Sequence, residues 1–318
     1  MYRKTGTLLT AALLGLTATI GWAVPAAAAP SASASASASA SASASADAPT
    51  VAVSRLVLEP TERGYRGSLR VTVTNNSDST DFLYFQIREA VAGSFFESAE
   101  FPCDPVGLSE GRQVRECGFP GGVQVAPGER RRANVEFQVL TTPRSYPMIA
   151  AGGSVTVQST TFGGLEAVPF SAQFRSLDGK LTRPQTYLQD SQPDASIELA
   201  GPVTEGPENT RRVPVRVRYA GDAPHRDLEV NAQLPVGASI LYCEPSAGPP
   251  WGGGAYVPGG QMMAGEERVF ALFISRPSDP ADEANPIDLE LSTSWLETVP
   301  DVDPSDNTVT FNLAVAAS

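Results

Sequence analysis

Apolar and polar residues alternate with a period of two along much of this chain, whereas no segment of useful length has a helical period. The clearest example is the segment 211–240, in which two extended stretches flank a short polar turn. The residues on the apolar side of these stretches are Val213, Val215, Val217, Leu228, Val230 and Ala232. Such alternation is typical of β-strands that have one buried face and one solvent-exposed face.

The same alternation recurs before and after this segment and predicts further strands. They are centred on 51–53, 56–58, 69–73, 82–87, 133–139, 155–157 and 168–174 in the first half, and on 197–199, 269–274, 287–291 and 309–315 in the second half. Residues 269–274 are apolar at every position, which is typical of a central strand. We therefore predict an all-β protein of two tandem antiparallel β-sandwiches with about seven strands each.

Composition divides the chain into distinct segments. Residues 1–28 have a basic start, an apolar run and a small-residue cleavage site, as in a secretory signal peptide; a retained membrane anchor is the alternative. Residues 29–48 contain a Ser-Ala repeat with too little apolar surface to fold, so we expect a disordered tether or, alternatively, a sugar-decorated stalk. The first sandwich is predicted at 49–176, a polar linker at 177–194 and the second sandwich at 195–318.

Charge limits the partners of the exported chain. The sequence has Lys+Arg 23 and Asp+Glu 35; loss of Arg3 and Lys4 with the signal peptide leaves 21 basic against 35 acidic residues, a net charge of −14. An acidic surface repels nucleic acid and anionic lipid. We therefore expect no nucleic-acid partner. No second apolar run of spanning length follows the signal peptide, so we expect no membrane span in the mature chain. The signal peptide predicts a secreted, extracellular protein, which we expect to be a monomer, with cell-wall association as an open alternative. The basic run 130–132 at a strand entry is expected to be solvated.

The three cysteines suit an oxidising compartment. Cys103 and Cys117 are fourteen positions apart in one polar, Pro/Gly-rich stretch, and we predict a local disulfide, which the chain-entropy model values at about 3 kcal/mol. Cys243 is then left over. It ends an apolar run, so we expect a buried free thiol; the alternative is a disulfide between two chains.

The two predicted sandwiches share motifs in the same order. APGERRRANVEFQVLTTP in the first matches MAGEERVFALFISRPSDP in the second, and in each a Gly-Glu turn precedes a strongly apolar strand. This order indicates an internal duplication of a domain-sized module.

Further features of the second half carry a family resemblance. They are a Val-x-Val strand, the turn 220–223, the Leu-Pro-x-Gly corner 234–237, the Gly-Glu turn 264–266 and the acidic segment 301–308. In these the chain resembles the immunoglobulin-like conserved-repeat modules of bacterial and archaeal surface proteins, a domain of unknown function (number eleven) close to cell-adhesion-related modules. The first half resembles them more weakly, because it has no Leu-Pro-x-Gly corner. The resemblance implies an immunoglobulin-like fold, a surface or spacer role and no catalytic residues.

Catalytic and metal chemistry has little support in the sequence. His225 is the only histidine and lies in a polar turn, where we expect it to be solvated. One histidine without a close cysteine pair excludes an ordinary zinc site, and no nucleophile elbow or phosphate-binding loop is present. We therefore expect no enzyme activity and no cofactor. Asp301, Asp303 and Asp306 are candidate calcium ligands, with a solvated acidic turn as the alternative.

Trp251 and Tyr256 are the candidate ligand-binding residues. They lie in a Pro/Gly-rich segment, 245–260, that has no alternation and that we expect to be a loop. Exposed loop aromatics can stack on sugar rings or fill a partner's pocket, or they can fold back and seal the edge of a sandwich. The sequence thus predicts a secreted, non-catalytic structural or adhesive protein that contacts a cell-envelope component. The alternative is a module that binds an extracellular glycan.

Overall fold

The computed structural model describes residues 47–96, 102–293 and 300–315. The predicted signal peptide and nearly all of the predicted tether lie outside the described residues. About half of the described residues are in strands, and the helices among them are three short 3-10 helices, η1 (Pro207–Asn209), η2 (Pro280–Ala284) and η3 (Pro304–Asp306). The prediction of an all-β protein is confirmed. No helix in the described ranges is long and apolar enough to cross a membrane.

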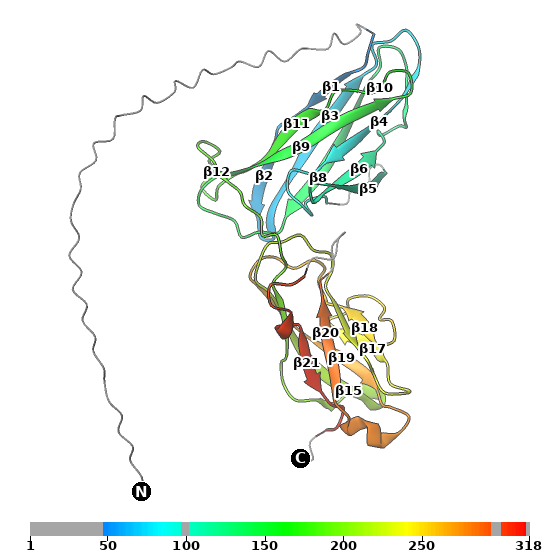
Figure 1. The fold of residues 1–318 in the computed structure, drawn as a ribbon, viewed down its shortest axis with the longest axis vertical. Coiled ribbons are helices and arrows are strands. Elements are labelled where there is room, and N and C mark those ends of the chain that lie inside the picture. The colour runs from blue at the N-terminus through cyan, green and yellow to red at the C-terminus, as the bar shows by residue number, and fades with distance from the viewer. Residues whose placement is uncertain (1–46, 97–101, 294–299, 316–318) are drawn as a thin grey trace, which may run out of the picture. The chain divides into compact units, whose positions relative to one another are not determined.

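We call residues 50–187 the N-terminal region. Its strands (Figure 1) are β1 (Thr50–Val53), β2 (Leu56–Thr61), β3 (Gly64–Thr74), β4 (Asp81–Arg88), β5 (Cys103–Ser109), β6 (Arg112–Cys117), β7 (Gln124–Val125), β8 (Arg130–Val139), β9 (Met148–Ser159), β10 (Gly163–Gly164), β11 (Val168–Phe174) and β12 (Gln185–Thr186). They form one sheet along the path β1-β3-β2-β11-β9-β4-β6-β5, with β8 on β3. The short strands β7, β10 and β12 pair with β4 or β9.

Strand β2 joins the two parts of this sheet because it changes partner along its length. Residues Glu59–Thr61 pair with β3, whereas Leu56–Leu58 pair in parallel with β11. Strand β2 therefore connects the part formed by β1, β3 and β8 to the part formed by β11, β9, β4, β6 and β5, and side chains from both parts share one core. This core includes six fully buried side chains at predicted apolar positions of β3 and β4, namely Leu69, Val71, Val73, Leu83, Phe85 and Ile87.

Part of the segment predicted to be a linker packs on this core. Strand β12 pairs with β9, and the ring of the next residue, Tyr187, packs against Phe174 at a tilt of 37°, with ring centroids 4.7 Å apart. Tyr187 is only 9% exposed. The segment 177–194 is mostly polar, so its composition did not predict that Tyr187 would be buried. The N-terminal region therefore extends beyond the predicted boundary at residue 176.

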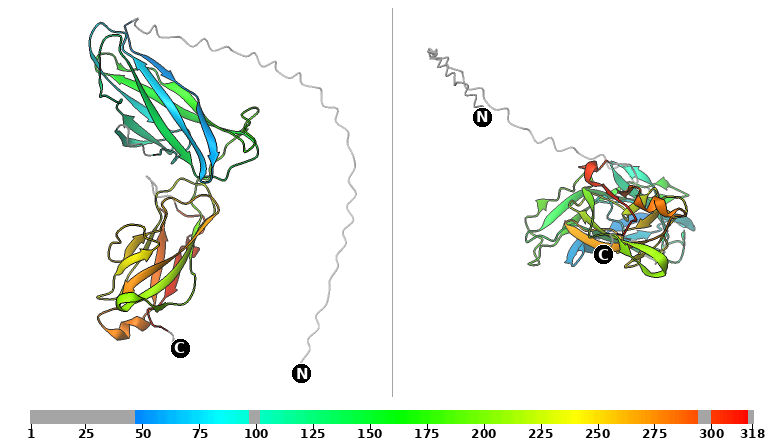
Figure 2. Two further views of the ribbon diagram at one scale, coloured as in Figure 1. Left: turned by 180° about the vertical axis from the view of Figure 1, so that it is seen from behind. Right: turned by 90° about the horizontal axis from the view of Figure 1, so that it is seen from below.

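We call residues 195–313 the C-terminal region. Its strands are β13 (Ala195–Leu199), β14 (Thr204–Glu205), β15 (Thr210–Tyr219), β16 (Glu229–Ala232), β17 (Ile240–Glu244), β18 (Gly254–Tyr256), β19 (Glu266–Ser275), β20 (Ile287–Ser292) and β21 (Thr308–Phe311). They form two sheets with the orders β13-β15-β19-β17 and β18-β16-β20-β21, and β14 adds to β15. Both sheets can be followed from behind in Figure 2. Apolar side chains from the two sheets share one core.

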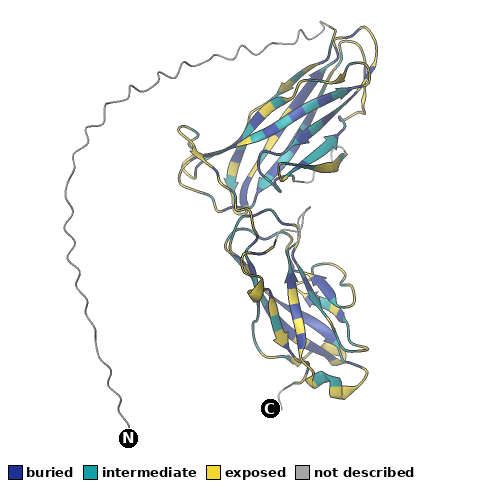
Figure 3. Cartoon of the chain, in the orientation of Figure 1, coloured by how far each residue is buried: buried dark blue, intermediate teal, exposed yellow. Residues whose placement is uncertain are grey.

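The predicted alternation is visible as alternating buried and exposed positions along these strands (Figure 3). Val213, Val215 and Val217 of β15 are all fully buried. β19 lies between β15 and β17, and its residues from Phe270 to Ile274 are at most 4% exposed. The prediction that this apolar segment is a central strand is therefore confirmed.

A hydrogen-bonded turn of the same design precedes β8 and β19. We call these the Gly-Glu turns, residues 126–131 and 263–268. In each, the glutamate carboxylate accepts the backbone N–H three residues earlier, over 2.8 Å in the first turn and 2.7 Å in the second. The glycines, Gly128 and Gly265, have φ of 69° and 78°, a conformation that a side chain would disfavour. The chain therefore passes from the turn into β8 and into β19 with the same backbone geometry.

Each Gly-Glu turn also positions an arginine two residues after the glutamate. Arg131 donates to two backbone carbonyl oxygens at 3.0 and 3.2 Å, and Arg268 donates to three at 2.6–2.9 Å. Each arginine also pairs with the glutamate of its own turn. The guanidinium groups therefore hold a neighbouring loop against the strand entry. The expectation that Arg131 is solvated is wrong, because its side chain is only 20% exposed.

We expect Arg268→Lys to lower the free energy of unfolding by about 2 kcal/mol, because one ammonium group cannot satisfy the carbonyl oxygens that the planar guanidinium bridges. Arg131→Lys should have a similar effect. Arg212→Lys, at an exposed position of β15, is the matched control and should change stability by less than about 0.5 kcal/mol. Chemical denaturation followed by circular dichroism measures these values. Equal stability of all three variants would contradict the bridging role.

Candidate functional site

Trp251, three residues before β18, and Tyr256, the last residue of β18, come together at the edge of the sheet β18-β16-β20-β21. The backbone N–H of Trp251 donates to the carbonyl oxygen of Gly254 over 3.0 Å, and the N–H of Gly254 donates in return over 3.3 Å. The two aromatic rings meet edge to face, with centroids 4.9 Å apart and an interplanar angle of 68°. The segment predicted to be a loop thus contains a tight turn and a short strand that orient both rings.

The indole of Trp251 lies directly against Gly254. A Cβ atom at position 254 would overlap Nε1 of Trp251 and crowd Oδ1 of Asn231, so glycine is needed for the ring to lie across the strand. Trp251 nonetheless remains 42% exposed, and Tyr256 remains 39% exposed. Trp251 therefore folds back onto the sheet, as one of the alternatives predicted, and still presents an aromatic surface to solvent.

A groove of about 650 Å³ lies beside Trp251 on the outer face of this sheet. Its lining includes Trp251, Gly254, Asn231, Asp288, Glu290 and Thr308. The strand register places Asn231 of β16 opposite Glu290 of β20, and Glu290 opposite Thr308 of β21. One row of polar side chains therefore crosses three strands and leads toward the exposed tryptophan.

Among the residues that the structure describes, the lining of the groove contains acidic side chains and no lysine or arginine. Asp288 and Glu290 are both exposed, and Asp288 accepts a hydrogen bond from the hydroxyl group of Thr310 over 2.6 Å. Glu290 has no ion-pair partner within the described ranges. The groove therefore offers carboxylate and amide oxygens that a ligand can approach.

The outer face of the other sheet in this region has neutralised its acidic residues. Glu198 and Glu267 each pair with Arg216 and Arg218, at N–O distances of 2.7–3.1 Å. Hydrogen bonds from these arginines lower the pKa of both carboxyl groups. The two outer faces of the C-terminal region thus differ in how many of their carboxylates are free to meet a ligand.

The candidate calcium ligands shape the turn before β21. The two carboxylate oxygens of Asp301, which is 9% exposed, accept the backbone N–H groups of Ala195 and Asp303, each over 3.1 Å. Asp303 caps η3 by accepting the backbone N–H of Ser305 over 3.1 Å, and Asp306 ends that helix. Within the part of the chain that the structure describes, no group of three or more potential metal ligands occurs. The carboxylates of Asp301 and Asp303 therefore stabilise the turn before β21 by accepting backbone hydrogen bonds.

His225 is buried, so the expectation that it is solvated is wrong. It is 4% exposed, and its ring packs against Tyr219 with centroids 4.4 Å apart. Nε2 lies 2.9 Å from the carbonyl oxygen of Met262, and Nδ1 contacts the carbonyl oxygen of Arg226. Burial lowers the pKa of His225, although both carbonyl contacts favour the protonated ring. The residue joins the turn after β15 to the segment before β19.

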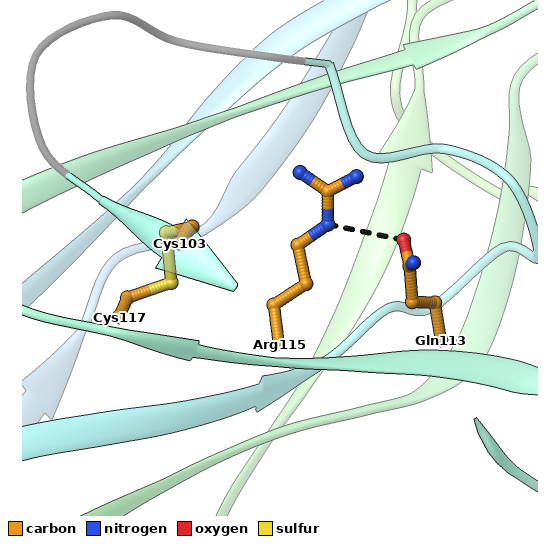
Figure 4. The surroundings of a disulfide bond; sticks show 4 residues. All are labelled: Cys103, Gln113, Arg115 and Cys117. Carbon is orange, nitrogen blue, oxygen red and sulfur yellow. Dashed lines mark hydrogen bonds between the residues drawn. A yellow bond between two sulfur atoms is a disulfide. The ribbon is translucent and has the colours of Figure 1, made fainter. Parts of the chain in front are cut away.

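The predicted disulfide between Cys103 and Cys117 is confirmed and joins the neighbouring strands β5 and β6 (Figure 4). The two cysteines are directly opposite in the strand register. On the same strand as Cys117, Nε of Arg115 donates to Oε1 of Gln113 over 3.0 Å (Figure 4). Cys243 is a buried free thiol, as expected, and burial raises its pKa.

Glu89 is a buried carboxyl group that sequence reasoning missed. It is fully buried after β4 and accepts the backbone N–H groups of Gly93, Ser94 and Gln113 over 2.7–2.9 Å. These bonds tie the segment after β4 to β6. Burial raises the pKa of Glu89 to about 7, and the backbone donors oppose this rise. The only signal in the sequence is one acid directly before the apolar run 90–92.

No protein-family model and no curated protein matches the chain. Solved structures match at low similarity. A protein of unknown function from Porphyromonas gingivalis W83 is 13% identical with a TM-score of 0.22, covering 83% of this chain and 97% of that one. The YadV chaperone is 9% identical with a TM-score of 0.22, covering 84% and 100%. The secreted serine protease VesC from Vibrio cholerae is 13% identical with a TM-score of 0.21, covering 78% and 51%. Scores this low carry no argument about function.

We expect Gly254→Ala to displace the Trp251 indole without unfolding the protein, because the added methyl group meets a side chain and not the backbone of another strand. The displaced ring should become more accessible to acrylamide, which quenches its fluorescence. Gly252→Ala is the control: a Cβ there meets no atom within 4 Å, although its φ of 62° adds backbone strain. Unchanged quenching in Gly254→Ala would show that the glycine does not seat the indole.

The stability of the C-terminal region should fall as pH is lowered below 6.5. A native pKa below the ordinary value of 6.5 means that the unfolded chain binds more protons in this window, so stability rises with pH there. His225→Gln keeps an N–H donor for the carbonyl group of Met262 and should remove this contribution. We compare the change in free energy of unfolding between pH 7.5 and 5.5 in the unaltered protein with the same change in His225→Gln. Because His225 is the only histidine and both proteins contain Glu89, the difference between the two changes is the contribution of His225. Identical pH dependence in both proteins would contradict the assignment.

Proposed function

We propose that this protein is a secreted, non-catalytic adhesive protein of the bacterial cell envelope or extracellular space, and that the groove beside Trp251 binds an extracellular glycan. The observation that carries the proposal is the exposed indole at the edge of a polar sheet face. An aromatic ring of this kind can stack on the apolar face of a sugar, while amide, carboxylate and hydroxyl groups bind its hydroxyl groups. Asn231, Glu290 and Thr308 supply such groups in one row.

We also propose that both regions are immunoglobulin-like modules of common origin. The sheets β13-β15-β19-β17 and β18-β16-β20-β21 correspond to the ABED and CFG sheets of an immunoglobulin constant-type domain with one added strand. In the N-terminal region, the path β11-β9-β4-β6-β5 corresponds to the GFC sheet of a variable-type domain extended by two strands. The shared Gly-Glu turns support a common origin.

A structural role without a glycan ligand is the second candidate. It is favoured by the ion pairs between arginine and glutamate on the outer face of β13-β15-β19, because they leave few free charges on that face for a ligand. Cell fractionation separates the location from the ligand. Recovery of the protein in the envelope fraction supports an adhesive or structural role, whereas exclusive recovery as a free monomer in the medium counts against it.

Trp251→Ala should weaken binding to cell-wall polysaccharide at least about fivefold, because loss of one central aromatic contact costs more than about 1 kcal/mol at typical interfaces. Tyr146→Ala removes an aromatic side chain of similar exposure, 38%, from the N-terminal region and should leave binding unchanged. Affinity electrophoresis or calorimetry with purified wall polysaccharides measures the effect. Absence of binding by the unaltered protein rejects the glycan proposal, and equal binding by Trp251→Ala moves the site elsewhere.

A further inference from the structure

We propose that the groove prefers glycans that carry free, protonated amino groups, such as glucosamine polymers, over neutral, N-acetylated or acidic glycans. This inference rests on the proposed glycan-binding function and names the class of glycan. Two independent features of the groove point to a positively charged ligand: its available carboxylates and its exposed indole.

The carboxylates of Asp288 and Glu290 lie on one face of β20, because residues two apart in a strand point to the same side. Register places Thr310 opposite Asp288 and Thr308 opposite Glu290, so the positions across from both acids hold threonine where an arginine would have neutralised them. An ammonium group can therefore reach either carboxylate. A charge-assisted hydrogen bond of this kind is roughly twice as strong as one between neutral groups.

The exposed indole of Trp251 reinforces this preference. A cation over the face of a tryptophan is attracted by the quadrupole of the ring, and tryptophan gives the strongest such interaction among the aromatic side chains. An amino sugar can therefore stack its ring on the indole while its ammonium group remains close to the same aromatic surface. A neutral sugar keeps only the stacking contribution.

Charge also determines which ligands the groove excludes. An acidic polysaccharide would bring its carboxylates against Asp288 and Glu290, and the described part of the lining has no basic residue to accept them. An N-acetylated sugar retains its hydroxyl groups and ring face but has lost the cation. The expected order of affinity is therefore free amine first, then neutral and N-acetylated sugars, with acidic sugars last.

The experiment compares four oligosaccharides of equal length by calorimetry with the full mature chain: glucosamine, N-acetylglucosamine, glucose and glucuronic acid oligomers. We expect the glucosamine oligomer to bind at least tenfold more tightly than the N-acetylated one. The advantage should shrink as salt is raised, and it should disappear when pH exceeds the pKa of the sugar amine.

The variant Asp288→Asn/Glu290→Gln should lose most of this advantage and keep only the smaller part that the contact of the cation with the Trp251 indole supplies. Glu62→Gln/Asp104→Asn removes the same charge from exposed positions of the N-terminal region and should keep the advantage. Circular dichroism and thermal unfolding verify that both variants fold.

Each remaining outcome has a defined meaning. Equal affinity of the unaltered protein for glucosamine and N-acetylglucosamine oligomers overturns this inference and leaves the proposed function intact. An equal loss in both double variants also overturns it, because attraction would then come from net charge. Binding to none of the oligomers overturns the inference, and binding to no wall polysaccharide overturns the proposed function with it.

Discussion

The pairing of β15 with β19 is the constraint on which the C-terminal region depends. Ten consecutive residue pairs join the two strands, from Thr210–Ser275 to Tyr219–Glu266. Because side chains alternate with a period of two, a shift of one residue would turn every buried valine of β15 to solvent. The Gly-Glu turn fixes this register, since the N–H of Gly265 donates to the carbonyl oxygen of Tyr219 over 2.8 Å at the end of the ladder.

The same constraint operates in the N-terminal region. Ten pairs join β3 to β8, and Val73 faces Arg131 there as Val217 faces Arg268 in the C-terminal region. In both regions a buried valine is thus paired with the arginine that holds the neighbouring loop. This equivalence supports the proposed common origin of the two regions, and it explains why the sequences match best at the turn and at the strand that follows.

Alternation predicted the long strands correctly, because in a half-buried strand every second side chain faces the core and is apolar. It failed where other forces determine the structure. The hairpin β5–β6 is held by a disulfide and has mostly exposed residues in β5, so it has no alternation to detect. β18 is only three residues long and depends on the fit of Trp251 against Gly254. Burial of His225 and of Glu89 also involves one distant backbone partner each, Met262 and Gln113, which composition does not reveal.

The candidate site also has one part that the sequence predicted and another that depends on how the strands pair. Two aromatic residues in a Pro/Gly-rich segment were sufficient to predict Trp251 and Tyr256, but the acids beside them could not be chosen from the 35 in the sequence. The strand register determines which acids lie in the groove, namely Asp288 and Glu290. In the sheet β13-β15-β19, arginines of β15 lie beside Glu198 and Glu267, and the charges cancel. Across from the acids of β20, the neighbouring strand β21 presents threonines, and the charges remain. The sign of the groove therefore follows from which strands are neighbours, and the net charge of the protein does not determine it.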